Sequence, residues 1–301
     1  LHAREASGII PGGFFCGASF TVGMYMRKVP VLLLLLLATV AAAGSAPMPG
    51  ASAFSFTGWA GPALPVRLYL PEGLAADTPV VIVMHGASRD ADRYFDDWRE
   101  VADEYNLIVV VPAFGAADFP KSAAYNLGNR VAANGQAIPQ EGWSFAAIEP
   151  LFDEVVARVG GAQTGYSLYG HSAGSQLVHR FLYYMPQARV QRAIAANAGW
   201  YTVPEFGIEY PYGLEHAGVS EEQLEVALAR RLVLLLGDAD IDTNASKLRK
   251  TPEAELQGAN RFMRGHTMFR VASAKARELE TDFNWSLQVV PGAGHVNAQM
   301  T

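Results

Sequence analysis

Cysteine is nearly absent from this sequence, in which Cys16 is the only one among 301 residues. A single thiol cannot form an intramolecular disulfide, which excludes a fold that depends on disulfide bonds. Charged residues are also sparse, at 17% of the chain, and the formal net charge is −6 with no basic stretch to offset it. Nucleic acid is therefore not expected as a partner. Apolar residues, in contrast, make up 50% of the chain, enough for a large core.

The N-terminal part lacks the run of roughly 20 apolar residues that a membrane-spanning helix needs. Its apolar stretch, residues 29–43, follows a basic start at Met26-Arg27-Lys28 and precedes small residues up to Ala46. This order predicts a secretory signal peptide over residues 26–46, and the alternative, a membrane anchor, would need a longer run. We therefore expect an exported protein, periplasmic or extracellular, with no stable membrane anchor after cleavage of the signal.

The expected domain boundaries follow from that signal. Residues 1–25 are expected to be upstream sequence ahead of the true start, and residues 47–301 to form one domain. Residues 1–46 hold three of the 23 basic and one of the 29 acidic residues, which leaves 20 against 28 in the domain and a net charge of −8.

Apolar runs of strand length alternate with segments of helical periodicity along residues 47–301. Strand-like runs lie at 79–84, 107–111, 166–169, 190–196, 232–236 and 286–290, and those at 79–84, 107–111 and 232–236 have the continuous apolar sequence typical of buried strands. Runs around 53–57 and 65–70 are expected to pair as antiparallel strands at a sheet edge. The pattern predicts an α/β fold with a mostly parallel central sheet, helices on both faces and no large separate cap domain.

Two details concern segments between these elements. A helical region that begins at Thr251 is expected to be broken at Gly258 and again at Gly265.

Long aromatic loops at 113–142 and 199–212 should lie near the carboxyl ends of strands, where reactive groups of such sheets collect. The aromatic residues predicted to line an apolar acyl pocket there, with the core as their alternative location, are Tyr125, Trp200 and Tyr201.

The chemical signal of the chain is the pentapeptide Gly170-His171-Ser172-Ala173-Gly174, between a strand-like and a helix-like run. Strand, G-x-S-x-G and helix in that order are typical of a nucleophile elbow, in which a sharp turn exposes the serine hydroxyl. The two glycines remove Cβ atoms that would collide across the turn. The start of a helix also offers free N–H groups to a developing oxyanion.

A serine nucleophile needs a base near neutral pH and a carboxylate that orients this base. His295 lies in a glycine-rich turn after the last predicted strand, and three aspartates follow the strand that ends at Leu236. These are Asp238, Asp240 and Asp242. The other histidines near strand ends, His85, His171 and His179, are expected to be structural.

With this order of Ser, Asp and His, the sequence resembles the α/β-hydrolase superfamily over essentially all of residues 47–301. His85-Gly86 after the third strand and the elbow at 170–174 also match. Within that superfamily it is similar to exported bacterial esterases related to polyhydroxybutyrate depolymerases, in the turn at 85–92, the loop at 125–129 and Gly237-x-x-Asp240. The resemblance implies Ser172 as nucleophile, His295 as base, and an oxyanion hole from the backbone N–H groups of Ala87 and Ala173.

The G-x-x-D pattern of similar hydrolases favours Asp240 as the acid of the triad. Asp242 is the alternative, although it could equally brace its loop through side-chain bonds to the backbone, and Asp238 should still be turning off the strand. The same aspartates mimic the start of a calcium loop, but Thr243 replaces the required glycine and Arg249 the required glutamate. No metal site is predicted.

The sequence therefore predicts a serine hydrolase that cleaves small or polymeric carboxylic esters through an acyl-enzyme, with no cofactor. The triad alone does not separate ester from amide cleavage, so an exported peptidase or amidase stays open, as does an acyltransferase. A hydrolase fold that serves as a catalytically idle binding module is the non-enzymatic alternative. Such a module would be expected to lose a member of the triad, whereas this chain keeps all three.

Overall fold

The computed structural model describes residues 17, 23 and 47–301, so the predicted upstream segment and signal peptide lie outside the described residues. Residues 47–301 are built on one eight-stranded sheet with the order β1-β2-β4-β3-β5-β6-β7-β8. The strands are β1 Gly50–Phe56, β2 Leu64–Leu70, β3 Val80–Met84, β4 Ile108–Pro112, β5 Tyr166–His171, β6 Val190–Ala196, β7 Leu232–Gly237 and β8 Trp285–Val290.

Strands β3 to β8 run parallel, and only the β1–β2 and β2–β4 pairs are antiparallel. β1 and β2 form the predicted antiparallel pair at the sheet edge, joined in register from Gly50 opposite Leu70 to Phe56 opposite Leu64. The central strands β3 and β4 are buried at every position, which explains their continuous apolar sequence. Because β3 to β8 run parallel, their carboxyl ends all meet at one edge of the sheet.

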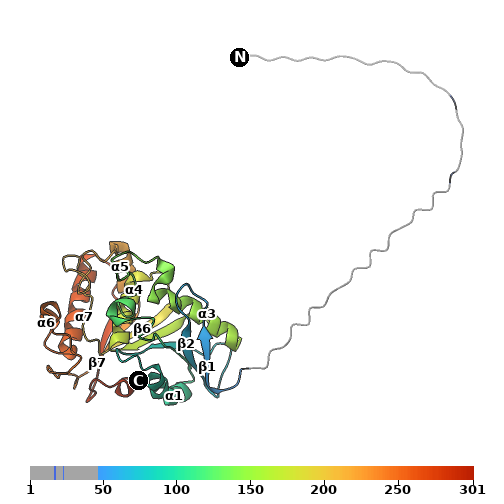
Figure 1. Cartoon of the computed structure of the whole chain (residues 1–301), viewed down its shortest axis with the longest axis horizontal. Coiled ribbons are helices and arrows are strands. Elements are labelled where there is room, and N and C mark those ends of the chain that lie inside the picture. Colours follow the sequence, from blue (N-terminus) through green and yellow to red (C-terminus); the bar gives the residue numbers. More distant parts are fainter. Residues whose placement is uncertain (1–16, 18–22, 24–46) are drawn as a thin grey trace. The chain divides into compact units, whose positions relative to one another are not determined.

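Helices cover both faces of this sheet (Figure 1). The helices and helical turns are α1 Ala91–Tyr105, α2 Lys121–Ala124, η1 Gln140–Gly142, η2 Ser144–Ala147, α3 Ile148–Val159, α4 Ala173–Tyr184, α5 Glu221–Ala229, α6 Pro252–Gln257, α7 Arg261–Glu278 and η3 Asn297–Gln299. Because side chains alternate along a strand, Val81 and Val83 of β3 point to the face covered by α1. Val80 and Ile82 point to the face covered by α3, α4, α5 and α7. The predicted α/β architecture is thus confirmed.

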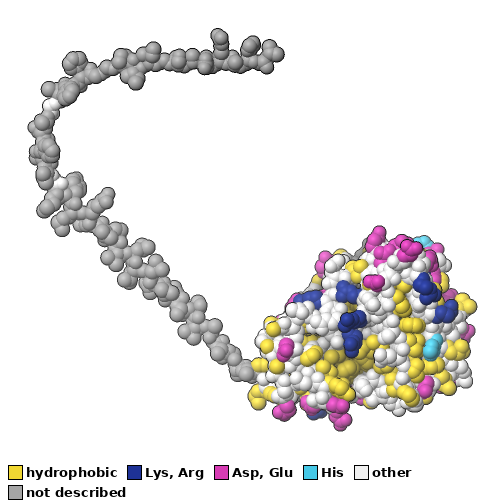
Figure 2. Space-filling view, turned by 180° about the vertical axis from the view of Figure 1, so that it is seen from behind, with side chains coloured by type: hydrophobic (Ala, Val, Ile, Leu, Met, Phe, Trp, Pro, Cys, Tyr) yellow, Lys and Arg dark blue, Asp and Glu magenta, His cyan; other side chains and the backbone are white. Residues whose placement is uncertain are grey.

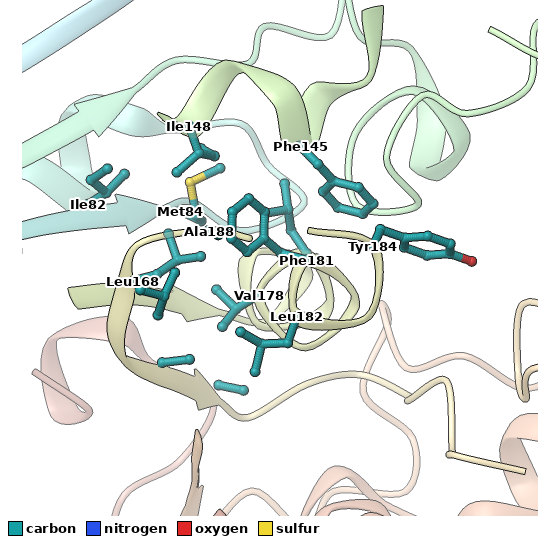
Figure 3. Close-up of a cluster of buried hydrophobic side chains, with 14 of the residues drawn as sticks. Ile82, Met84, Phe145, Ile148, Leu168, Val178, Phe181, Leu182, Tyr184 and Ala188 are labelled. Atoms are coloured by element: carbon teal, nitrogen blue, oxygen red, sulfur yellow. The ribbon is translucent and has the colours of Figure 1, made fainter. Parts of the chain in front are cut away.

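Helix α4 forms the centre of the larger core. Figure 3 shows Val178, Phe181 and Leu182 of α4 beside Ile82 and Leu168, which come from β3 and β5. The apolar side chains recur every three or four residues along α4, so one face of the helix meets the sheet. This packing fixes the start of α4, where Ser172 lies. Within the described residues, no helix has the length and apolar content needed to cross a bilayer.

The helical region after Thr251 differs from its prediction at one of two glycines. Helix α6 ends at Gly258 as expected, but α7 continues through Gly265. A Cβ atom at Gly265 would lie 2.4 Å from Cδ2 of Leu236, a fully buried residue of β7. The glycine therefore permits a close approach of α7 to the sheet and does not end the helix.

We predict that Gly265→Ala destabilises the protein. Alanine is favoured over glycine inside a helix by about 1 kcal/mol, but overpacking against Leu236 costs about 1–3 kcal/mol. A net loss in the free energy of unfolding is expected in urea titrations. The control is Arg270→Ala, at an exposed site of the same helix, where a change within about 0.5 kcal/mol is expected. A stabilised Gly265→Ala variant would contradict this account of the glycine.

Candidate active site

Ser172 lies in a sharp turn between β5 and α4. Its backbone angles are φ 58° and ψ −114°, in a region that non-glycine residues rarely adopt. A Cβ atom at Gly170 would lie 2.3 Å from the backbone of Gly174, and one at Gly174 would lie 2.0 Å from the carbonyl oxygen of Met84. Only glycine fits at these two positions, as the collision argument from the sequence requires.

The structure brings Ser172, Asp240 and His295 together from three strand ends. Nε2 of His295 lies 3.0 Å from Oγ of Ser172, and its Nδ1 lies 2.7 Å from Oδ2 of Asp240. Both separations fall within hydrogen-bond distance. The imidazole can accept the serine proton while the carboxylate holds its Nδ1–H, which is the arrangement that activates a serine hydroxyl.

Arg261 contacts the acid of this group and was not anticipated from the sequence. Its Nη1 donates to Oδ1 of Asp240 at 3.1 Å, and the two side chains are only 3% and 2% exposed. A buried carboxylate needs such compensation, because removing its charge from water is costly. Asp240 thus binds Arg261 with one oxygen and His295 with the other.

The other two aspartates have different partners. Oδ1 of Asp242 accepts from the backbone N–H of Asn244 at 2.8 Å, the loop-bracing contact considered from the sequence. Oδ1 of Asp238 accepts from the N–H of Gly292 at 2.6 Å and so joins the acid loop to the turn that holds His295. Neither aspartate contacts His295, which leaves Asp240 in the position of the acid.

Asn197, at the end of β6, makes a second connection between these two loops. Its side chain accepts from the N–H of Gly237 at 2.9 Å and donates to the carbonyl oxygen of Gly294 at 3.0 Å. Asn197 is buried and has φ 45°, a conformation that asparagine tolerates. The only feature of the sequence that could have indicated this role of Asn197 is its position directly after a strand.

Ala87 and Ala173, whose backbone N–H groups the sequence proposed for an oxyanion hole, both line the cavity beside Ser172. Neither N–H donates a hydrogen bond to another described residue. A Cβ atom at Gly86 would come within 3.6 Å of Cβ of Ser172, so the segment after β3 closely approaches the serine. Two free donors beside a serine hydroxyl are what an oxyanion hole requires.

The other histidines near Ser172 have partners of their own. His85 is fully buried, its Nε2 accepts from the N–H of Phe114, and burial lowers its pKa to about 4. His171 contacts the hydroxyl of Tyr94 at 2.9 Å, and burial, with the neighbouring His295, lowers the pKa of His171 well below its usual value. Nε2 of His179 accepts from the N–H of Thr202. These rings are neutral near pH 7 and serve as structural groups.

A cavity of about 470 Å³ opens beside Ser172. Tyr125 and Trp200 line it, whereas Tyr201 does not and is fully buried in the core, 5.3 Å from His179 between ring centroids. The lining is rich in Lys and Arg, so the cavity is not the apolar pocket that the aromatic loops predicted. Phe114, Phe119 and other aromatic side chains of these loops pack into the core instead.

One group of described residues could offer three ligands to a metal ion. It comprises Glu209, Glu215 and His216, and Nδ1 of His216 lies 3.1 Å from Oε2 of Glu209. None of the three lines the cavity at Ser172.

No family model matches the chain, and the comparison with curated proteins gives no match. Solved structures do match. Poly(aspartic acid) hydrolase-1 from Sphingomonas sp. KT-1 is 46% identical, with a TM-score of 0.82 over 84% of this chain and 96% of that one. The chain belongs to the α/β-hydrolase superfamily.

Two more structures match the chain. LpqC, a poly(3-hydroxybutyrate) depolymerase from Bordetella parapertussis, is 33% identical, with a TM-score of 0.78 over 84% of this chain and 87% of that one. This confirms the resemblance to polyhydroxybutyrate depolymerases. An S-formylglutathione hydrolase from Agrobacterium tumefaciens is 15% identical with a TM-score of 0.54, over 83% of this chain and 91% of that one, and shares the fold alone. The chain is thus an esterase-like hydrolase.

We predict that Asp240→Asn lowers kcat by about 10⁴, because the amide would hold the imidazole in the wrong tautomer. Asp242→Asn should keep near-normal kcat and lose at most about 1 kcal/mol of stability, since it only weakens a loop contact. Steady-state kinetics and thermal melting of the two variants separate these effects. An inactive, folded Asp242→Asn variant beside an active Asp240→Asn variant would assign the acid to Asp242.

Proposed function

We propose that residues 47–301 are a serine hydrolase that cleaves carboxylic esters through an acyl-enzyme on Ser172. The observation that carries the proposal is the continuous chain of contacts from Ser172 through His295 to Asp240, at 3.0 and 2.7 Å. The serine at its head is held in an elbow at the mouth of a cavity. Membership of an esterase-like hydrolase group supports the same chemistry.

The proposed reaction has two halves. His295 accepts the proton of Ser172 as Oγ attacks the acyl carbon, and the backbone N–H groups of Ala87 and Ala173 stabilise the oxyanion. His295 then passes the proton to the leaving alcohol. In the second half, water enters, gives a proton to His295 and attacks the acyl-enzyme, after which Ser172 recovers its proton. Asp240 keeps the imidazole oriented and stabilises its cation, and Arg261 holds Asp240 in place.

Amide cleavage is a second candidate, because the 46% identical relative is named a poly(aspartic acid) hydrolase. The backbone of that polymer is made of amide bonds. The same triad can attack either bond, and the difference lies in the leaving group, since an amine must be protonated before it departs.

The test compares wild type with Ser172→Ala on 4-nitrophenyl esters, on 4-nitroanilides of the same acids and on poly(aspartic acid). We expect ester hydrolysis and labelling by a fluorophosphonate probe from wild type, and loss of at least about 10³ in kcat from the variant. An unchanged melting temperature shows that the variant is folded. Labelling that survives in Ser172→Ala would reject the nucleophile, and a wild type that cleaves only the amide substrates would favour the second candidate.

We also propose that residues 26–46 direct export and are then removed. The support is the sequence order of a basic start, an apolar run and small residues. Expressed from Met26 in a bacterium, the protein should be recovered outside the cytoplasm with a new N-terminus between Gly44 and Pro47. N-terminal sequencing of each cell fraction checks this. A cytoplasmic protein that keeps residue 26 would contradict it.

A further inference from the structure

The cavity beside Ser172 has a charge that the rest of the domain does not share. Six of its 18 lining residues are Lys or Arg, and none is Asp or Glu. Residues 47–301 contain more acidic than basic residues, so this bias is not a matter of composition. Figure 2 shows one face of the molecule, on which several Lys and Arg side chains lie near the middle and others toward the right, while most Asp and Glu side chains lie nearer its margins.

Two of the six cations are held by a buried ion pair or by several hydrogen bonds within the protein. Arg261 is paired with the buried carboxylate of Asp240. The guanidinium of Arg89 donates to the carbonyl oxygens of Phe114, Phe119 and Lys121, at 2.8 to 2.9 Å, and so holds the loop after β4. The four that remain are exposed and lie in the segments that follow β4 and β7, and they are Lys121, Lys247, Arg249 and Lys250.

Arg249 donates to the hydroxyl of Tyr212, and Lys250 donates to the carbonyl oxygen of Thr243. The side chains of the other two, Lys121 and Lys247, form no hydrogen bond or ion pair with any described residue. Lys121 follows β4 and Lys247 follows β7, strands that lie on opposite sides of β5 in the sheet. Lys247 also lines a second cavity of about 170 Å³, together with Ser172 and His295. Two lysines without a side-chain partner among the described residues therefore line the same cavity as Ser172, from segments that follow strands on the two sides of β5.

Unpaired cations around a concave site attract anions, because the surrounding protein focuses their field into the cavity. The reaction proposed above acts on derivatives of carboxylic acids, and the simplest negative charge on such an acyl chain is a second carboxylate. Resting on that proposed function, we propose that the substrate carries a free carboxylate near the scissile bond, bound by Lys247 and Lys121. Acyl chains without charge would be the poorer substrates.

A matched pair of esters tests this. The mono-4-nitrophenyl ester of adipic acid carries a free carboxylate, and methyl 4-nitrophenyl adipate is its neutral counterpart of the same chain length. We expect kcat/KM of wild type to be about tenfold or more higher for the charged ester, since one charge-assisted hydrogen bond strengthens binding by about that factor. The preference should fall as NaCl is raised, because the lysines are exposed.

In Lys247→Gln and Lys121→Gln the ratio of the two kcat/KM values should drop several-fold, and it should drop further in the double variant. The ratio is taken within each variant, so a general loss of activity cancels. Lys247→Arg should restore most of the preference. The matched control is Arg231→Gln, which removes one exposed charge directly before β7, at the opposite end of the parallel strands, and should leave the ratio unchanged.

The outcomes separate this proposal from the one on which it rests. A wild type that hydrolyses both esters at equal kcat/KM, or lysine variants that keep the wild-type ratio, would overturn the carboxylate site while the hydrolase function stands. A wild type that hydrolyses neither ester would reject the proposed ester-hydrolase function itself. An equal drop in Arg231→Gln would show that net charge, and not the two lysines, sets the preference.

Discussion

The strained backbone of Ser172 is the constraint on which the rest of the site depends. A residue in such a conformation costs on the order of 1–3 kcal/mol, and it persists only where the surroundings impose it. Here the surroundings are helix α4, in which every side chain from Ala173 to Tyr184 is buried. Each fully buried side chain such as Leu177 or Phe181 contributes about 1.5–3 kcal/mol. The packing of α4 therefore outweighs the strain at its first turn.

The same helix also positions the loops that line the cavity, through polar side chains that would otherwise destabilise a core. Oε1 of Gln176 accepts from the side chain of Asn126 at 2.6 Å, and Arg180 donates to the carbonyl oxygen of Asn126 and to the hydroxyl of Thr202. Burial lowers the pKa of Arg180 to about 10, so it keeps its charge near pH 7 and remains a strong donor. Nucleophile and cavity walls thus share one rigid support.

The parts of the site that the sequence predicted are those tied to strand ends. Ser172, Asp240 and His295 each follow an apolar run, and parallel strands bring such positions to one edge. Arg261 and Asn197 were missed because their roles arise from contacts between elements distant in sequence, with no local pattern to mark them. Gly265 was misread for a related reason, since its cause is the side chain of Leu236 on another element. Tyr201 and Trp200 are adjacent aromatic residues that the sequence did not distinguish, yet Tyr201 packs into the core whereas Trp200 lines the cavity.

The positive charges near Ser172 divide into a fixed set and an adaptable set. Arg261 and Asp240 are both almost fully buried and neutralise each other, so their pair adds little to the field in the cavity and is shielded from salt. The exposed lysines of the segments after β4 and β7 lie outside this pair. Loops tolerate substitution far better than a buried network does. The charge that supports the catalytic groups is therefore separated physically from the charge that would select a substrate, and the second can change in sequence without disturbing the first.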